Sequence, residues 1–324
     1  MRKPIWRLAV VLGLAIILGA GALPNAASGQ RNGPVVLLPL YQLGDGVYGI
    51  QGSDVLPDVP VGSMNTGFVV GDDGVFVFAC NLQNFESRLA TIRTVTDKPI
   101  RWMANGHMAS DDSGCNSEFR AMGATLIGSR AMRDHYLEWM PARLALELRT
   151  PAGRALWEGR GVAAPDITFE DELVLHLGEG RETHLIWMGT GHTVGDTVVY
   201  LPQQRVLFTA DLLFAYLHPT ARDGDTRNWQ RILARMSAWD IDWIVPGHGP
   251  ILEGKSYLQT QSTYFDVMRE RVRALMQQGL SVEDVISRID FGEYRDWGRQ
   301  NEAAETLEKI YHELQEEMGA AGQH

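Results

Sequence analysis

The sequence predicts an α/β fold in which two β-rich halves, each flanked by helices, form a sandwich of sheets with the helices outside. Short apolar runs bounded by Gly, Pro or charged residues occur in both halves and are typical of strands. Helical spacings separate and follow these runs. The chain has 324 residues, of which 45% are hydrophobic and 21% charged, so it can form one large domain plus an appendage.

The first half opens with a predicted β-meander. Residues 47–52 are strand-like, and residues 67–70 and 75–78 are β-rich runs joined by the turn signal Asp72-Asp73-Gly74. A helix over 85–95 follows, because Leu89, Ile92 and Val95 recur at helical intervals. The remaining predicted elements of this half are a strand at 100–104, a helix starting near 118–122, a strand at 125–128 and a helical stretch over 131–160.

The second half repeats the strand pattern and ends in helices. Its predicted strands are 167–169, 173–177, 184–187, 197–201, 206–208 and, after a helix at 229–236, a last strand at 241–245. Beyond Gly254 the pattern is helical, with helices expected at 257–278, 281–289 and 303–318. Their apolar spacings indicate packing against the sandwich, with dimerisation as the alternative. We therefore divide the chain into residues 1–29, a main domain at 30–254 and a C-terminal helical extension at 255–324.

The N-terminus has the order of an export signal. Arg2, Lys3 and Arg7 precede the apolar run 8–23, and a small, polar stretch follows, with cleavage expected after Gly29. This predicts a periplasmic or secreted protein. The alternative is an uncleaved N-terminal anchor, because no charge occurs between Leu8 and Gln30.

Charge and cysteine content narrow the function classes. The formal net charge is −11 and no cluster of Lys or Arg is present, so a nucleic-acid partner is not expected. The two cysteines are Cys80 and Cys115. In an exported chain they can form a disulfide, and the alternative is a pair of buried free thiols.

Four polar loops carry the residues that suggest chemistry, and each follows a predicted apolar strand. They are residues 105–114 with His107 and Asp111, residues 189–196 with His192, residues 208–211 with Asp211, and residues 245–250 with His248. Any one of them has an ordinary explanation as a turn or a solvated histidine. Their joint order, with a nitrogen or oxygen ligand mostly beside Gly, indicates a site built from strand-end loops.

This order resembles the metallo-β-lactamase superfamily, with its His-x-His-x-Asp-His loop followed by Gly-His, Asp and Gly-His. The resemblance runs from about residue 47 to 254 and is greatest to the glyoxalase II-like and quinoprotein-relay-type branches. It implies a four-layer αββα sandwich and a metal-dependent hydrolase acting on a small molecule. It also places His107, Asp111, His192, Asp211 and His248 at ligand positions.

Two positions depart from the family pattern. Ala109 stands where the second histidine is expected and Asp112 where the last histidine of the first loop is expected. The expected Asp-Thr-Gly turn is replaced by Ala79-Cys80-Asn81, and the resemblance places Cys80 under the metal loop that ends before Cys115. We therefore predict a Cys80–Cys115 disulfide, bracing the loop in place of the lost aspartate.

The remaining ligand sets decide which metals are expected. His107, His192 and Asp211 would suffice for a catalytic Zn²⁺ with one open position, and they also suit Fe²⁺. A second position with Asp111, Asp112, Asp211 and His248 is rich in oxygen and favours Mn²⁺ or Fe²⁺. We expect one or two ions, with Zn²⁺ as the first candidate.

The expected reaction is hydrolysis by a metal-activated water. The resemblance assigns Asp111 to orienting the water and passing a proton, with Asp112 sharing that role. The bond is an ester, thioester, lactam or similar. Residues 52–66 are predicted to form a semi-rigid flap over the site, and the alternative is an ordinary surface hairpin. A true β-lactamase is disfavoured because the four loops hold no Lys for a lactam carboxylate. The alternative function is a degenerate, non-catalytic binding protein, motivated by Ala109.

Overall fold

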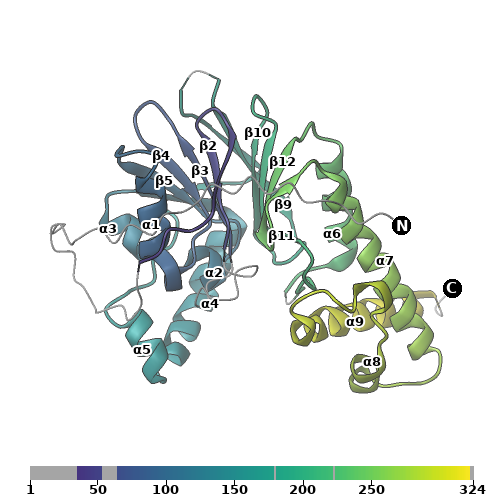
Figure 1. The fold of residues 1–324 in the computed structure, drawn as a ribbon. Helices are drawn as coiled ribbons and strands as arrows, with labels where there is room; N and C mark the ends of the chain where they lie inside the picture. Colours follow the sequence, from purple (N-terminus) through teal and green to yellow (C-terminus); the bar gives the residue numbers. More distant parts are fainter. Residues whose placement is uncertain (1–34, 53–63, 179, 222, 322–324) are drawn as a thin grey trace.

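The computed structural model describes residues 35–52, 64–178, 180–221 and 223–321. Two sheets stand side by side with helices on their outer faces (Figure 1). The predicted export signal, the alternative anchor and most of the predicted flap lie outside the described residues. Within the described ranges, no helix combines the length and the apolarity that a bilayer-spanning segment needs.

The first sheet has seven strands in the order of the chain. They are β1 (Leu40–Gly44), β2 (Val47–Ile50), β3 (Thr66–Val70), β4 (Val75–Phe78), β5 (Ile100–Ala104), β6 (Thr125–Ser129) and β7 (Ile167–Phe169). Pairing is antiparallel from β1 to β4 and parallel from β4 to β7. The carboxyl ends of β4, β5 and β6 therefore lie at one edge of the sheet, where the first polar loop leaves β5.

The second sheet has six strands in the order β13-β12-β11-β10-β9-β8. They are β8 (Glu172–His176), β9 (Glu182–Gly189), β10 (Asp196–Leu201), β11 (Val206–Phe214), β12 (Trp243–His248) and β13 (Leu252–Glu253). Strands β11 and β12 are parallel, whereas every other neighbouring pair is antiparallel. The parallel pair brings Phe214 and His248 into register at the carboxyl ends of the two strands.

Helices cover the outer face of each sheet (Figure 1). The first half carries α1 (Phe85–Arg93), α2 (Ser110–Ser113), α3 (Asn116–Ala121), α4 (Arg130–Glu147) and α5 (Pro151–Trp157), with the short 3₁₀ turn η2 (Leu82–Asn84). The second carries α6 (Thr226–Ser237), α7 (Ser256–Met276), α8 (Val282–Arg288) and α9 (Ala303–Ala321), with the 3₁₀ turns η3 (Gly292–Tyr294) and η4 (Gln300–Glu302).

Alternating side chains build three cores between these layers. On β3, Phe68 packs toward the helices of the first half, whereas its neighbour Val69 packs between the two sheets. On β11, Phe208 packs between the sheets and Leu207 packs toward the helices of the second half. Because both faces of the central strands are buried, both carry apolar residues. The three cores separate four layers, so the predicted αββα sandwich is confirmed.

Some elements differ from the expectation. The sequence pattern did not predict β1, β13 and the helical turn α2 inside the first polar loop. It also ended the strand before Asp211 at residue 208, whereas β11 continues to Phe214, and it ended the strand before His248 at residue 245, whereas β12 includes His248. The physical reason in β11 is Ala210, whose φ of +45° produces a local irregularity that the strand then continues past.

Candidate metal centre

Asp211 lies in the middle of the centre, on the irregular part of β11. Its side chain is 3% exposed, and a Cβ on the neighbouring Gly247 would lie 2.2 Å from Asp211 Oδ1, so only glycine fits there. The strand is held from behind by Gln261 of α7, which accepts from Phe214 N–H at 2.8 Å and donates to Leu212 O at 3.0 Å. The Asp211 carboxylate is therefore fixed by β12, which carries Gly247, and by α7, which carries Gln261.

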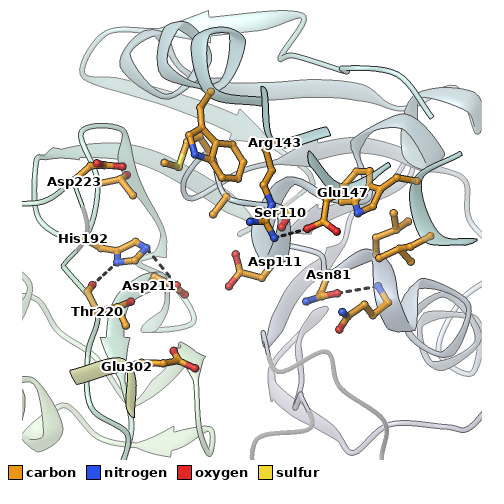
Figure 2. A pocket seen from close by; sticks show the side chains of 18 of the residues that line it. Asn81, Ser110, Asp111, Arg143, Glu147, His192, Asp211, Thr220, Asp223 and Glu302 are labelled. Carbon is orange, nitrogen blue, oxygen red and sulfur yellow. Dashed lines mark hydrogen bonds and ion pairs between the residues drawn. The ribbon is translucent and has the colours of Figure 1, made fainter. Parts of the chain in front are cut away.

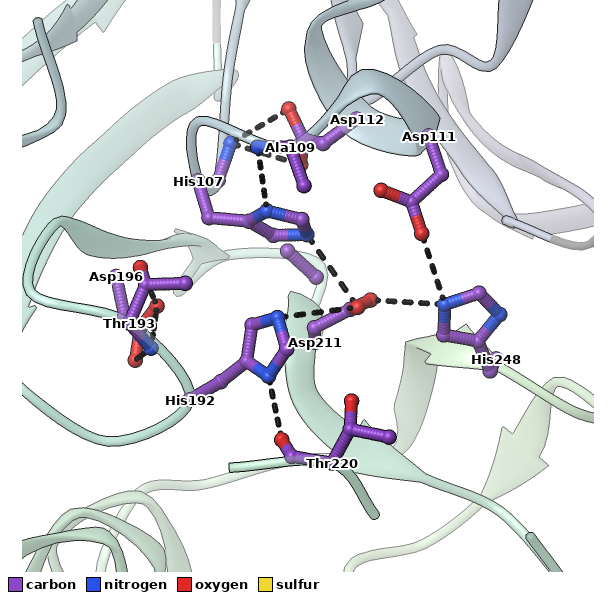
Figure 3. A network of polar contacts seen from close by, with 12 residues as sticks. His107, Ala109, Asp111, Asp112, His192, Thr193, Asp196, Asp211, Thr220 and His248 are labelled. Carbon is purple, nitrogen blue, oxygen red and sulfur yellow. Dashed lines mark hydrogen bonds and ion pairs between the residues drawn. The ribbon is translucent and has the colours of Figure 1, made fainter. Parts of the chain in front are cut away.

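His192 is oriented toward Asp211 by its other ring nitrogen. Nδ1 lies 2.6 Å from the carbonyl oxygen of Thr220 and must donate to it, because a carbonyl can only accept. The proton is thereby held on Nδ1, and Nε2, 3.5 Å from Asp211 Oδ2, keeps a lone pair for a ligand (Figure 3). This is the arrangement that a metal-binding histidine requires.

His107 faces the same carboxylate oxygen from the first loop. Its side chain is 1% exposed, and Nε2 lies 3.4 Å from Asp211 Oδ2. Its Nδ1, however, accepts the N–H of Ala109 at 3.1 Å. A histidine that binds a metal through Nε2 carries its proton on Nδ1, so this contact would have to change on coordination.

A second set of ligand atoms lies on the other side of Asp211. His248 Nε2 is 3.2 Å from Asp211 Oδ1 and 3.5 Å from Asp111 Oδ2. The His248 ring stacks on Phe214 with 5.0 Å between centroids, which fixes its plane. Asp111 comes from α2 and is 30% exposed, more than any other member of the centre.

The two sets share Asp211 and together suit a divalent cation. We call His107, His192 and Asp211 the first group, and Asp111, Asp211 and His248 the second group; the ligand atoms of each group lie within 4.8 Å of one another. Among the described residues, His107 Nε2 and Asp211 Oδ1 are buried without a hydrogen-bond partner. Buried polar atoms rarely lack partners, and a cation would satisfy them.

The pKa values of the centre also suit a bound cation. Burial lowers the pKa of His107, but the carboxylates of Asp211, Asp112 and Asp111 outweigh burial and raise it to about 10. Burial raises the pKa of Asp211, but His248 and His107 hold it well below its usual value. The carboxylates thus favour positive charge at this place.

Asp112 lies elsewhere, which revises its expected role as a ligand and as a catalytic group. It is fully buried, and its two oxygens accept from the backbone N–H of Gly106, each at 3.0 Å, while Oδ1 also accepts from Asn105 Nδ2. Successive residues of the helical turn α2 point in different directions, so Asp111 and Asp112 cannot both face the centre. Asp112 braces the first loop, and burial raises its pKa to about 7.

Asp196 has the same bracing role in the second loop, a role that the motifs did not predict. Its carboxylate accepts from Gly191 N–H at 2.9 Å and from Thr193 N–H and Oγ1 at 3.0 and 2.6 Å. The sequence signal was present, because Thr193 and Asp196 flank a turn that ends in Gly195.

The predicted disulfide is confirmed: Cys80 and Cys115 are bonded, with 5.6 Å between their Cα atoms. The bond links the Ala79-Cys80-Asn81 turn to the residue before α3. Cys80 N–H also donates to Asp112 O at 2.8 Å, so the turn and the first loop are joined twice. Ala79, at φ +61°, bends the chain at this point.

A cavity of about 480 Å³ opens beside the centre (Figure 2). Asp111, His192 and Asp211 line it. One wall comes from α4 and α5, with Trp139, Arg143, Glu147, Leu156 and Trp157; another contains Thr220, Asp223, Arg299 and Glu302. Neither arginine could be found from the motifs, because both lie on elements far from the four loops.

Comparison with known proteins identifies the superfamily that part of the chain resembles. A model of the metallo-β-lactamase superfamily matches residues 124–248, a segment that includes His192, Asp211 and His248. The first loop, with its departures Ala109 and Asp112, lies outside that match. The altered part of the proposed site is therefore the part that the model does not cover.

Curated relatives match parts of the chain. A metallo-β-lactamase type 2 from Bacteroides fragilis is 30% identical over 95 residues, which cover 28% of this chain and 38% of the relative. A hydroxyacylglutathione hydrolase from Mesorhizobium japonicum is 37% identical over 83 residues, covering 25% and 32%. A 2,4-dinitroanisole O-demethylase subunit alpha from Nocardioides sp. is 26% identical over 154 residues, covering 47% and 41%. Each match thus spans less than half of the relative.

Solved structures show the same fold. A metallo-β-lactamase from Pontibacter korlensis superposes with a TM-score of 0.56 at 21% identity, covering 70% of this chain and 97% of its own. An inverting sec-alkylsulfatase from Pseudomonas sp. gives a TM-score of 0.63 at 18% identity, covering 85% of this chain and 50% of its own.

Proposed function

The chain belongs to the metallo-β-lactamase superfamily, and from this premise we propose that it is an exported, metal-dependent hydrolase of a small-molecule substrate. The observation that carries the proposal is Asp211, a buried carboxylate shared by two groups of ligand atoms at the edge of a cavity. When bound, a divalent cation supplies Lewis acidity that activates water for attack on an ester, thioester, lactam or similar bond.

The side chains of the centre have distinct parts in this proposal. His107, His192 and Asp211 would hold one ion, and Asp111, Asp211 and His248 a second. Asp111 also lines the cavity, and this supports the proposal that it orients a water molecule and accepts its proton. Although burial raises the pKa of Asp111, His248 and His107 bring it below its usual value, so the group is a carboxylate at neutral pH.

The ligand chemistry favours Zn²⁺ and also accommodates Fe²⁺ or Mn²⁺. The two groups offer imidazole nitrogens and carboxylate oxygens only, since both cysteines form the disulfide. Such sets occur in catalytic zinc sites and in non-haem iron sites. The disulfide also supports the proposed export to an oxidising compartment.

One observation favours a second function, that of a binding protein without catalysis. Ala109 supplies no ligand, and its N–H occupies Nδ1 of His107 in a way that opposes coordination through Nε2. A chain that holds a metal weakly in the first group could bind a small molecule without hydrolysing it.

Hydrolysis assays separate the two functions. Purified protein loaded with Zn²⁺, Fe²⁺ or Mn²⁺ is assayed on 4-nitrophenyl ester, thioester, lactam, phosphodiester and sulfate-ester probes. We expect turnover of at least one probe, its loss on chelation, and its loss in His248→Ala but not in His176→Ala, whose histidine is exposed. Absence of turnover for every probe in both the wild type and Ala109→His, with metal bound, would establish the non-catalytic alternative.

A further inference from the structure

The chain that joins β11 to α6 determines how His192 is oriented. We call its described residues, 215–221 and 223–225, the β11–α6 connection. Nδ1 of His192 donates to the carbonyl oxygen of Thr220 at 2.6 Å, which leaves Nε2 as the nitrogen that can bind a metal (Figure 3). At the far end of the connection, Asp225 N–H donates at 3.0 Å to the carbonyl of the residue before His192. The connection therefore contacts the His192 loop at two points.

Helix α9 of the C-terminal extension holds this connection near both of its ends. Thr306 Oγ1 donates at 2.6 Å to the carbonyl oxygen of Pro219, the residue before Thr220. Farther along α9, the Glu313 carboxylate accepts from Thr226 N–H at 2.8 Å and from its hydroxyl at 2.5 Å, and Thr226 is the first residue of α6. Thr306 and Glu313 are seven positions apart, so they lie on one face of α9. That face contacts the connection on either side of Thr220.

These contacts of α9 are shielded from water. Thr306, Thr226 and Glu313 are each at most 2% exposed. Arg269 of α7 donates to the Glu313 carboxylate and compensates its buried charge. A hydrogen bond lost at such a place is not replaced by a bond to solvent. The extension therefore sets the position of the connection.

A backbone contact from the same extension supports the connection near its start. Leu217 and Gly298 form an isolated β-bridge, and His218 N–H donates to Gly298 O at 2.9 Å. The chain is thus held by the extension on one side, while the carbonyl of Thr220 faces His192 on the other. The sequence indicated only that the C-terminal helices pack against the sandwich, and these contacts give the extension a more specific place.

We propose that the C-terminal extension positions His192 for metal binding. Thr306 is the positioning residue: it holds Pro219, which places the neighbouring carbonyl of Thr220 against the imidazole ring. The inference rests on the proposed function, because it concerns a ligand of the same metal centre. It gives α9 a part in that centre, although α9 lies outside residues 124–248, which the superfamily model matches.

Removing the hydroxyl of Thr306 tests the proposal. Thr306→Val keeps the shape of the side chain but takes this donor away from Pro219 O. We expect the Kd for Zn²⁺ in the first group to rise about 3- to 10-fold, less than the roughly 10- to 100-fold effect of losing a direct partner of a metal ligand. Thr306→Ser keeps the hydroxyl and should restore the wild-type Kd. Competition with a chromophoric chelator measures these values.

A matched control and a stability measurement separate positioning from packing. Thr263→Val makes the same change in α7 of the same extension, where the exposed hydroxyl donates to Gln259 O at 2.9 Å, and it should leave the Kd unchanged. Urea unfolding is then compared for metal-free and Zn²⁺-loaded protein. A residue that only packs lowers the stability of both forms equally, whereas a positioning residue lowers that of the loaded form more, because weaker metal binding adds to the loss.

The ring of His192 also reports on the inference without any metal. Long-range proton–nitrogen NMR spectra of the metal-free protein, recorded above the ordinary histidine pKa of about 6.5, distinguish the two neutral tautomers. We expect His192 to be protonated on Nδ1 in the wild type and in Thr306→Ser, and to populate both tautomers in Thr306→Val. The spectrum of His192→Gln assigns the signals.

The outcomes distinguish this inference from the proposed function. If the wild type binds Zn²⁺ and Thr306→Val has the same Kd, or loses equal stability with and without Zn²⁺, the positioning role is overturned and the metal centre stands. If the wild type binds no metal, the proposed function fails, and the NMR spectra decide the inference alone. A His192 tautomer that Thr306→Val leaves unchanged would then overturn it, whereas a mixture of tautomers would support it.

Discussion

Two neighbouring aspartates in the first loop have different surroundings and therefore different expected roles. Asp111 lines the cavity and lies 3.5 Å from His248 Nε2, whereas Asp112 is fully buried on the N–H of Gly106. The sequence cannot separate them, because both are aspartates in the same motif. The separation comes from the helical turn α2, which sends consecutive side chains in different directions.

Substituting each aspartate tests this division. Asp112→Asn replaces an acceptor oxygen by a donor beside Gly106 N–H, so at pH 8 it should lower the free energy of unfolding by about 1 to 3 kcal/mol while the metal content stays the same. Asp111→Asn should have the opposite profile, with lower metal content and a smaller change in stability. Urea unfolding and elemental analysis measure the two effects. Metal loss in Asp112→Asn equal to that in Asp111→Asn would contradict the bracing role.

At the scale of elements, the disulfide joins the turn after β4 to the start of α3 across 35 positions of sequence. Closing a loop of that length restricts the unfolded chain, which stabilises the fold by about 3 to 4 kcal/mol in the chain-entropy account. The linked turn also contacts Asp112 through Cys80 N–H. Loss of the disulfide should therefore loosen the first loop.

Urea unfolding with and without a reductant checks this. We expect reductant to lower the unfolding midpoint of the wild type, and the double variant Cys80→Ser with Cys115→Ser to unfold at the lowered midpoint under both conditions. Mass spectrometry of the non-reduced protein should find no free thiol. Two free thiols, or a midpoint that the reductant does not change, would be incompatible with the disulfide.

The elements show what the sequence could and could not predict. The strands β5 and β7 begin and end as predicted, because apolar runs bounded by turn residues mark them clearly. The extension of β11 beyond residue 208 could not be predicted, since it depends on Ala210 at a positive φ, a conformation that alanine rarely adopts. Because this extension was not predicted, Asp211 was expected in a loop at the end of a shorter strand.

The site could be predicted in part. Five of the six proposed ligands come together in the structure: His107, Asp111, His192, Asp211 and His248. That they bind metal remains a prediction. The cavity walls could not be predicted, because Arg143 and Arg299 come from α4 and from the segment before η4. No motif marks a residue whose position depends on how distant helices pack.

For the molecule as a whole, His218 links stability to pH. It is fully buried between Tyr264, Phe291 and Trp297, where the C-terminal extension meets the segment after β11. Burial lowers the pKa of His218 to about 4, below the value of about 6.5 of an unfolded histidine. The folded state thus binds this proton less well than the unfolded state.

The sign of the effect follows from linkage. The contribution of His218 to stability is complete above pH 6.5 and is lost as the pH falls toward 4, an effect of up to about 3 kcal/mol. Removing the titrating group in His218→Gln should therefore flatten the dependence of the unfolding free energy on pH in this window. The control His176→Gln, at a 73% exposed histidine, should keep the wild-type slope. Equal slopes in all three proteins would show that His218 titrates normally.

The metal content of the purified protein tests the central claim most directly, measured by elemental analysis for the wild type, Asp211→Asn and the control Asp242→Asn. Asp211 belongs to both groups, whereas Asp242 is 55% exposed and pairs with Arg205. The account predicts one or two ions of Zn²⁺, Fe²⁺ or Mn²⁺ per chain in the wild type and in Asp242→Asn, and their loss in Asp211→Asn. A wild type that retains no metal after loading, or an Asp211→Asn variant that retains as much as the wild type, would contradict it.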